Sequence, residues 1–151
     1  MKRTRPTLGL RPAAAYGRAE ALRSTASLIL WARQATDARP DDEYIHELRV
    51  RLRRARAVMR AFRRLYVDRD DFERKVAPLR RLSRALGPLR DADVTAALFE
   101  EALRTAPYPP RAVEALLARH HKTQTGRWQR LRAALKGVAR LEPAALCPPV
   151  A

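Results

Sequence analysis

The stretch that decides the fold is residues 45–66, which reads IHELRVRLRRARAVMRAFRRLY. Its apolar residues follow one another at intervals of three and four, the spacing that places side chains on one face of an α-helix. They are Ile45, Leu48, Leu52, Ala55, Met59 and Phe62. The segment therefore predicts an amphipathic helix whose apolar face packs against a protein core.

A second stripe, of basic residues, lies one position further along at the same spacing. Its members are His46, Arg49, Arg53, Arg56, Arg60 and Arg63. They span about 25 Å of helix at about 1.5 Å per residue, and the stretch holds one acid, Glu47. Guanidinium groups this close to one another and to a core are unfavourable unless an anion occupies the row. The alternative is an ordinary solvated charged face, which fits Arg51 and Arg54 on the opposite side better.

The rest of the chain has the same helical character, because no segment alternates with period two. We expect helices at about 12–35, 42–67, 70–104 and from after Pro110 to about 140, with acidic residues at 41–43 and 70–71 marking two starts. Gly87-Pro88 should kink or break the third helix. The pattern predicts an all-α protein, an antiparallel four-helix bundle in one domain over residues 12–141, with flexible tails at 1–11 and 142–151.

Composition narrows the classes of function. Among 151 residues, 32 Lys+Arg face 16 Asp+Glu, which gives a net charge of +16 and points to an anionic partner. A hydrophobic content of 46% argues against disorder. The single cysteine, Cys147, excludes an intramolecular disulfide and lacks the companions of a zinc site. No apolar run approaches the roughly 20 residues of a membrane span, so we expect a soluble cytoplasmic protein.

The charge comes mostly from arginine, whose planar fork binds phosphate oxygens bidentately. The five glycines are scattered, so no glycine-rich loop is available to wrap a phosphate, and binding must use side chains. A linear row of cations suits a linear polyanion. Aromatic residues are 6% of the chain, which leaves little to stack on bases. Inorganic polyphosphate therefore fits better than nucleic acid, which we expect only as a weaker competitor.

Two motifs resemble those of a known family. The run HELRV at 46–50, followed by Arg53, Arg54 and Arg56, is similar to the H-x-x-R-V-x-x-R-R-x-R signature of the CHAD family (conserved histidine α-helical domain). The run LRRLSRALGPLRDADV at 79–94 resembles its second signature, L-R-x-L-x-R-x-L-G-x-x-R-D-x-D-V. Weaker similarity extends over about residues 13–140.

This resemblance implies a helical module that binds inorganic polyphosphate through a basic surface or pore, often on polyphosphate granules, and that is not an enzyme and carries no cofactor. It also implies the side chains that would face the polymer, five from the second helix and three from the third. These are His46, Arg49, Arg53, Arg56 and Arg60, and Arg80, Arg84 and Arg90.

The chain departs from the family in one respect. A complete domain of the family is about twice as long, with two related halves around a basic channel, whereas the motif occurs here once. Either two chains associate to rebuild the channel or the site is an open groove. We favour a homodimer.

His46 lies in the first turn of its expected helix, where the dipole and the neighbouring arginines disfavour the protonated, positively charged form of the ring. We expect a neutral imidazole that donates one hydrogen bond to phosphate. A local bond to Glu43 or to another helix is the alternative. A phosphohistidine nucleophile lacks an accompanying acid–base pair, so a phosphohydrolase or phosphotransferase is the less favoured function.

Asp91 and Asp93 follow Gly87-Pro88. They suit a helix restarting after the proline, as caps, better than a magnesium site. The sequence therefore predicts no catalytic residue and no metal site.

Overall fold

The computed structural model describes residues 10–35, 41–105 and 110–149, and within α3 and α4 it leaves out the side chains at 90–97 and several positions beyond. It consists of helices α1 (Leu10–Arg33), α2 (Asp42–Ala61), α3 (Arg69–Thr105), α4 (Pro110–Ala139) and α5 (Pro143–Leu146), with a 3₁₀ turn at Arg63–Leu65. The described residues form no strand. The all-helical class is therefore confirmed.

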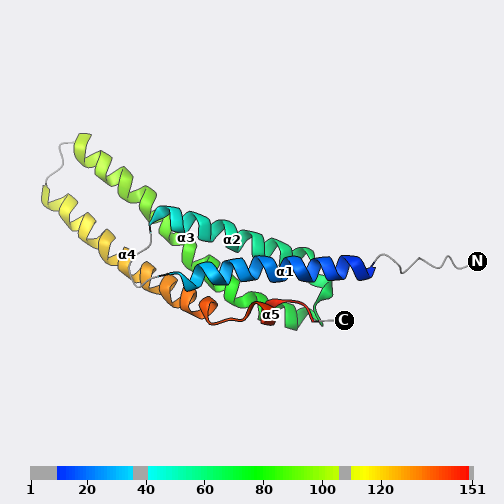
Figure 1. Ribbon diagram of the computed structural model, residues 1–151. Coiled ribbons are helices and arrows are strands. Elements are labelled where there is room, and N and C mark those ends of the chain that lie inside the picture. Colours follow the sequence, from blue (N-terminus) through cyan, green and yellow to red (C-terminus); the bar gives the residue numbers. More distant parts are fainter. Residues whose placement is uncertain (1–9, 36–40, 106–109, 150–151) are drawn as a thin grey trace, which may run out of the picture.

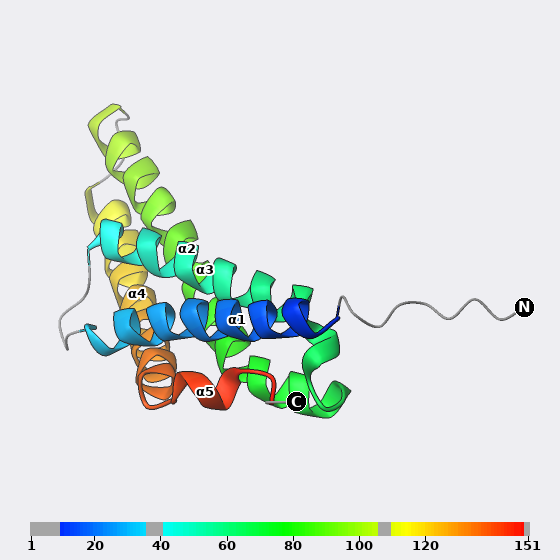
Figure 2. The ribbon, with the colours of Figure 1, turned by 45° about the vertical axis from the view of Figure 1, so that its right-hand side comes forward.

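The four long helices run in alternating directions along the chain (Figure 1). α1 packs against α2 and α4, and α3 packs against α2 and α4. The outer parts of α3 and α4 continue past the other helices as a projecting hairpin, which both views show (Figures 1 and 2). A four-helix bundle is therefore not confirmed, because the core that the described residues form lies at one end of this hairpin and also takes in α5.

The core is built from one face of each helix. α2 contributes Leu48, Leu52, Ala55 and Met59, four of the six residues of its expected apolar face. α3 contributes leucines on successive turns, including Leu79, Leu82, Leu86 and Leu89, and these meet Leu28 and Ile29 of α1 and Leu131, Leu135 and Val138 of α4. Such contacts, each removing apolar surface from water, fix the rotation of α2 and α3 about their axes.

The start of α2 matches the sequence expectation. Asp41 is the N-cap, and its side chain accepts a hydrogen bond of 2.7 Å from the backbone N–H of Tyr44. At α3 the capping carboxylate is Asp68, which accepts from the N–H of Asp71 at 2.7 Å. The expected caps Asp70 and Asp71 instead lie in the first turn.

The sequence predicted that α2 ends near residue 67, and this prediction is wrong. The helix stops at Ala61 with Phe62 as C-cap, and the chain makes a 3₁₀ turn. The turn redirects the chain so that Tyr66 is buried, lies edge-on to Phe72 at 5.2 Å and donates a hydrogen bond to the Leu146 carbonyl at 3.1 Å. That burial, not local periodicity, ends the helix.

The sequence predicted a kink or a break at Gly87-Pro88; the break is wrong, and the kink stays a prediction. α3 passes without interruption through Pro78 and Pro88. An interior proline costs about 3 kcal/mol, and the cost is offset here because Leu86 and Leu89, on either side, are buried in the core. Since no helix restarts there, Asp91 and Asp93 do not cap one.

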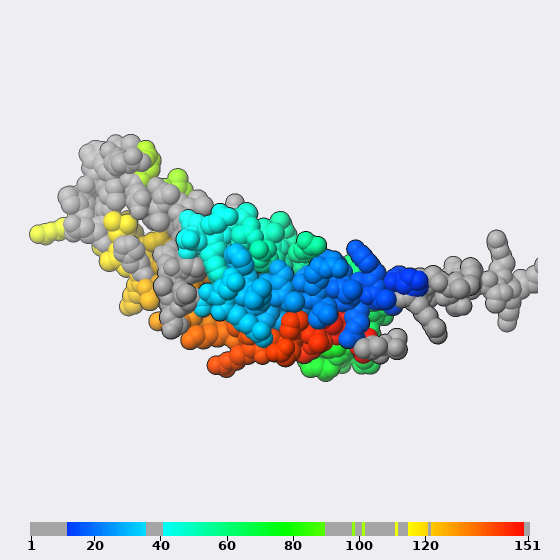
Figure 3. Space-filling view, viewed as in Figure 1, coloured from blue at the N-terminus to red at the C-terminus, as the bar shows by residue number. Residues whose placement is uncertain are grey.

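The expected flexible tail at 142–151 is corrected over residues 142–149. Leu146 and Cys147 are buried, and Arg18 of α1 donates to the Pro148 carbonyl at 2.6 Å. Figure 3 shows this segment lying along α1. Lys75 adds a bond of 3.0 Å to the Cys147 carbonyl. The prediction of a loose tail rested on its prolines. It overlooked Leu146, which packs into a core formed by residues far away in sequence. Residues 1–9 and 150–151 lie outside the described residues.

Candidate anion-binding groove

The basic stripe of α2 faces a groove between α2 and α3. This α2–α3 groove has a volume of about 550 Å³. Its lining comprises His46, Arg49, Val50, Leu52, Arg53, Arg56, Ala57 and Arg60 of α2, with Ser83, Leu86 and Gly87 of α3. Because the apolar face of α2 is locked into the core, the stripe next to it is turned toward α3.

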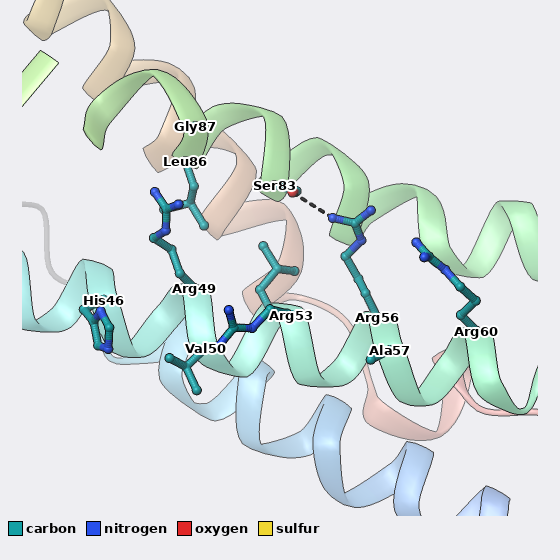
Figure 4. A pocket seen from close by; sticks show the side chains of 11 residues that line it. His46, Arg49, Val50, Arg53, Arg56, Ala57, Arg60, Ser83, Leu86 and Gly87 are labelled. Carbon is teal, nitrogen blue, oxygen red and sulfur yellow. Dashed lines mark hydrogen bonds between the residues drawn. The ribbon is translucent and has the colours of Figure 1, made fainter. Parts of the chain in front are cut away.

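The arginines of the groove have no counter-charge among the residues that the structure describes. Arg49, Arg53, Arg56 and Arg60 make no ion pair with any carboxylate among the described residues. Figure 4 shows Arg49, Arg56 and Arg60 reaching from α2 toward α3. No described lining residue is acidic or aromatic. The groove therefore presents a run of positive charge from Arg49 to Arg60, over about 17 Å of helix at about 1.5 Å per residue.

Arg49 is the least satisfied of them. Its Nη1 is shielded from solvent and has no hydrogen-bond partner in the part of the chain that the structure describes. A buried guanidinium nitrogen without a partner is unfavourable unless a ligand supplies the acceptor. An anion bound beside this buried nitrogen of Arg49 would therefore gain the most binding free energy.

Arg56 is held in place by its neighbour across the groove. Its Nη1 donates a hydrogen bond of 2.8 Å to Oγ of Ser83 (Figure 4). The bond fixes the side chain over the groove and leaves the other guanidinium donors available. Ser83 was not singled out from the sequence, although Ser83, Leu86 and Gly87 have the spacing of three and four that marks one face of α3.

The arginines on the other side of α2 are neutralised instead. Arg51 Nη1 lies 3.2 Å from Glu47 Oε2, and its Cζ lies 4.3 Å from the centre of the Trp31 ring. Arg54 Nη2 lies 3.0 Å from Oε1 of Glu20 on α1. The nearby acids thus serve Arg51 and Arg54, which the sequence assigned to an ordinary charged face, and leave the groove uncompensated.

Of the three predicted residues on α3, Arg80 and Arg84 do not line this groove. Arg80 is exposed and pairs with Glu73, and the Arg80 hydrogen bond holds the pKa of the Glu73 carboxyl below its usual range. Arg84 lines a different groove, between α3 and α4. The side chain of Arg90 lies outside the described residues. Arg63, beyond the end of α2, is exposed and does not line the groove.

His46 is exposed at the first turn of α2 and lines the same groove. No described residue pairs with it through a hydrogen bond or ion pair, so the alternative of a local bond to Glu43 is not found among them. Among the described residues no cluster of three or more His, Cys, Asp or Glu side chains could hold a metal ion.

These features define a helical protein with an uncompensated, arginine-lined groove. The CHAD domain model matches residues 20–144. The chain belongs to the CHAD family, as the two motifs indicated, and that family is associated with polyphosphate binding. No curated protein and no solved structure matches the chain. Over the described residues, no helix has the length and apolar character needed to cross a bilayer.

Proposed function

We propose that this protein binds inorganic polyphosphate in the α2–α3 groove and does not alter it chemically. The observation that carries the proposal is the row of four arginines that pair with no described carboxylate, one of which has a buried nitrogen with no partner in the described part of the chain. Family membership supports the same ligand. Successive phosphates of the polymer supply the acceptors that the row lacks.

The lining of the groove favours a polymer without bases over nucleic acid. A protein that binds single-stranded nucleic acid stacks bases on aromatic rings, and no described lining residue is aromatic. Competition separates the two ligands: long-chain polyphosphate should remain bound when DNA is added at equal phosphate concentration. Displacement by DNA would favour the nucleic-acid alternative.

The same lining favours binding over catalysis. His46 is the one described lining residue with an ordinary acid–base role, and no described carboxylate lines the groove to work with it. Incubation of the protein with polyphosphate and Mg²⁺ should release no phosphate above a protein-free blank. Release that the His46→Ala variant abolishes would contradict the proposal.

Charge reversal tests the site itself. Arg49→Glu with Arg53→Glu places two carboxylates in the groove and should lower the polyphosphate affinity of this groove at least a hundredfold, measured by titration. Arg64→Glu with Arg140→Glu makes the same change of net charge at two exposed arginines away from the groove and should lower affinity only a few-fold. Helical content by circular dichroism should match in both. Equal losses in the two variants would show attraction to net charge and refute the site.

The homodimer stays a proposal. It is motivated by the single copy of the motif, and the structure describes one chain. Light scattering should find a species of twice the chain mass, in the free protein or with polyphosphate bound. A strictly monomeric protein that binds tightly would leave the groove as an open, one-chain site.

A further inference from the structure

A second basic groove lies between α3 and α4. This α3–α4 groove has a volume of about 520 Å³. It is lined by Pro78, Arg81, Arg84 and Ala85 of α3 and by Arg130, Ala133, Ala134, Gly137 and Val138 of α4. Its lining residues are distinct from those of the α2–α3 groove.

The positive charge of this groove is also uncompensated. Arg81, Arg84 and Arg130 are exposed, and none forms an ion pair with a carboxylate that the structure describes. Arg130 Nε donates to the Gly126 carbonyl at 3.3 Å, which holds its stem along α4 and leaves its terminal nitrogens available. No described lining residue is acidic or aromatic. Three arginines line one depression, and guanidinium groups suit phosphate oxygens.

The floor of the groove leaves room for a ligand between the arginines. Four of its lining residues are small, Ala85, Ala133, Ala134 and Gly137. A Cβ added at Gly137 would meet no heavy atom within 4 Å. An anion can therefore approach the helix surfaces closely while the longer arginine side chains surround it.

The two grooves lie on opposite faces of α3. At about 100° per residue, Ser83 of the first groove and Ala85 of the second point about 200° apart around the helix axis. Leu86 of the first groove likewise points about 140° away from Arg81 and about 160° away from Arg84 of the second around the helix axis. With α3 between them, one short, straight polyanion cannot occupy both grooves.

We propose that the α3–α4 groove is a second polyphosphate-binding site, so that each molecule holds two polymer segments and cross-links long chains. The inference rests on the proposed function of the α2–α3 groove. Two sites on one rigid helix act as a bivalent connector, because binding at one leaves the other free for a second strand. Long polymer should then assemble with the protein into a network, whereas short polymer should not.

Calorimetric titration with a short polyphosphate of about seven units tests the number of sites. The wild-type protein should bind two such molecules per chain. Arg81→Gln with Arg130→Gln should bind one, since the first groove is untouched. Arg64→Gln with Arg140→Gln, which loses the same charge elsewhere, should still bind two. Gly137→Leu, which fills the floor without a change in charge, should bind one.

Turbidity with polymers of several hundred units tests the cross-linking. Wild-type protein should scatter light strongly at a protein-to-polymer ratio at which neither component is in excess. The Arg81→Gln with Arg130→Gln variant should still bind the polymer but should scatter at least fivefold less light. One short polymer per wild-type chain, unchanged in that variant, would overturn the second site and leave the first standing. Binding of no short polymer by the wild-type protein would overturn the proposed function itself.

Discussion

Arg49 illustrates how one residue can serve binding at a cost to folding. Its Nη1 is buried without a partner while the rest of the side chain packs beside the core. Removing an uncompensated buried charge is often neutral or stabilising, whereas removing a charge that meets a ligand weakens binding. Folding and binding therefore make opposite demands on this side chain.

Arg49→Met, which keeps the length and removes the charge, should separate these two demands. We expect the free energy of unfolding to stay equal or rise, since the unpaired nitrogen is gone. Polyphosphate affinity should fall about tenfold to a hundredfold, the effect of one charge-assisted contact. Urea unfolding and titration measure the two quantities. A large loss of stability would show that Arg49 is structural, and unchanged affinity would remove it from the site.

Asp71 has the opposite character, because its charge stabilises the fold. It is buried, and its Oδ2 lies 3.1 Å from Lys75 Nζ while Oδ1 accepts a bond of 2.7 Å from Arg74. Burial by itself raises the pKa of the Asp71 carboxyl, but the hydrogen bonds and charge of Lys75, with Arg74, outweigh it and lower the pKa. Lys75 in turn holds the Cys147 carbonyl.

Asp71→Asn should therefore destabilise the protein by about 1–3 kcal/mol at neutral pH, measured by urea unfolding. A lowered folded-state pKa stabilises the fold above the ordinary carboxyl value and loses that effect as pH falls through the lowered value. The difference between the variant and the wild-type protein should thus shrink below about pH 4. A difference that stays constant into that range would exclude the ionised carboxylate as its cause.

At the scale of the helix, two glycines in helical backbone have opposite surroundings. Gly17 of α1 faces Phe62 at the end of α2, and a Cβ there would lie 2.7 Å from two of its ring carbons. Gly87 of α3 lines the α2–α3 groove, and a Cβ there would meet nothing within 4 Å. Gly17 therefore lets α1 and α2 approach each other closely, and Gly87 keeps the α2–α3 groove wide.

The same substitution should therefore have opposite signs at the two positions. Gly87→Ala should stabilise the protein by about 0.5–1 kcal/mol, because alanine is the better helix former. Gly17→Ala should destabilise it, since the ring of Phe62 or the whole helix must move. Thermal unfolding followed by circular dichroism measures both. A gain at Gly17 would show that α1 and α2 pack less closely than the structure has them.

At the scale of the whole molecule, charge sets how binding depends on salt. The net charge of +16 attracts any polyanion, but only contacts in a groove add to the salt dependence of affinity through counterion release. For single-stranded nucleic acid, the slope of log affinity against log salt concentration is about −0.7 for each phosphate contact. By analogy, four arginine contacts in the α2–α3 groove should lower polyphosphate affinity by some tens-fold between 50 and 200 mM salt.

The salt dependence also identifies which arginines make contact. Arg53→Gln should reduce the slope of log affinity against log salt concentration by about one contact, and Arg64→Gln should leave the slope unchanged. Titrations of a short polyphosphate at four or more salt concentrations supply the slopes. Equal slopes in the wild-type protein and both variants would mean that the polymer does not engage the groove at Arg53.

The sequence by itself determined the helices and the phase of α2. Spacing of three and four is a local property, so Leu48, Leu52 and Met59 identify the buried face, and the stripe one residue on follows without knowledge of any neighbour. The same phase singled out Arg49, Arg53, Arg56 and Arg60 and set Arg51 and Arg54 apart. The family followed from two short motifs.

Only the tertiary structure decided what lies opposite that stripe. Ser83 and Gly87, which line the opposite side, are far from the stripe in sequence. Burial of Leu86 and Leu89 stabilises α3 as a continuous helix through Pro88. The core also placed Arg84 on the far side of α3 and drew Leu146 back onto the helices. Contacts between distant segments depend on the summed packing of all the helices, which no local pattern records.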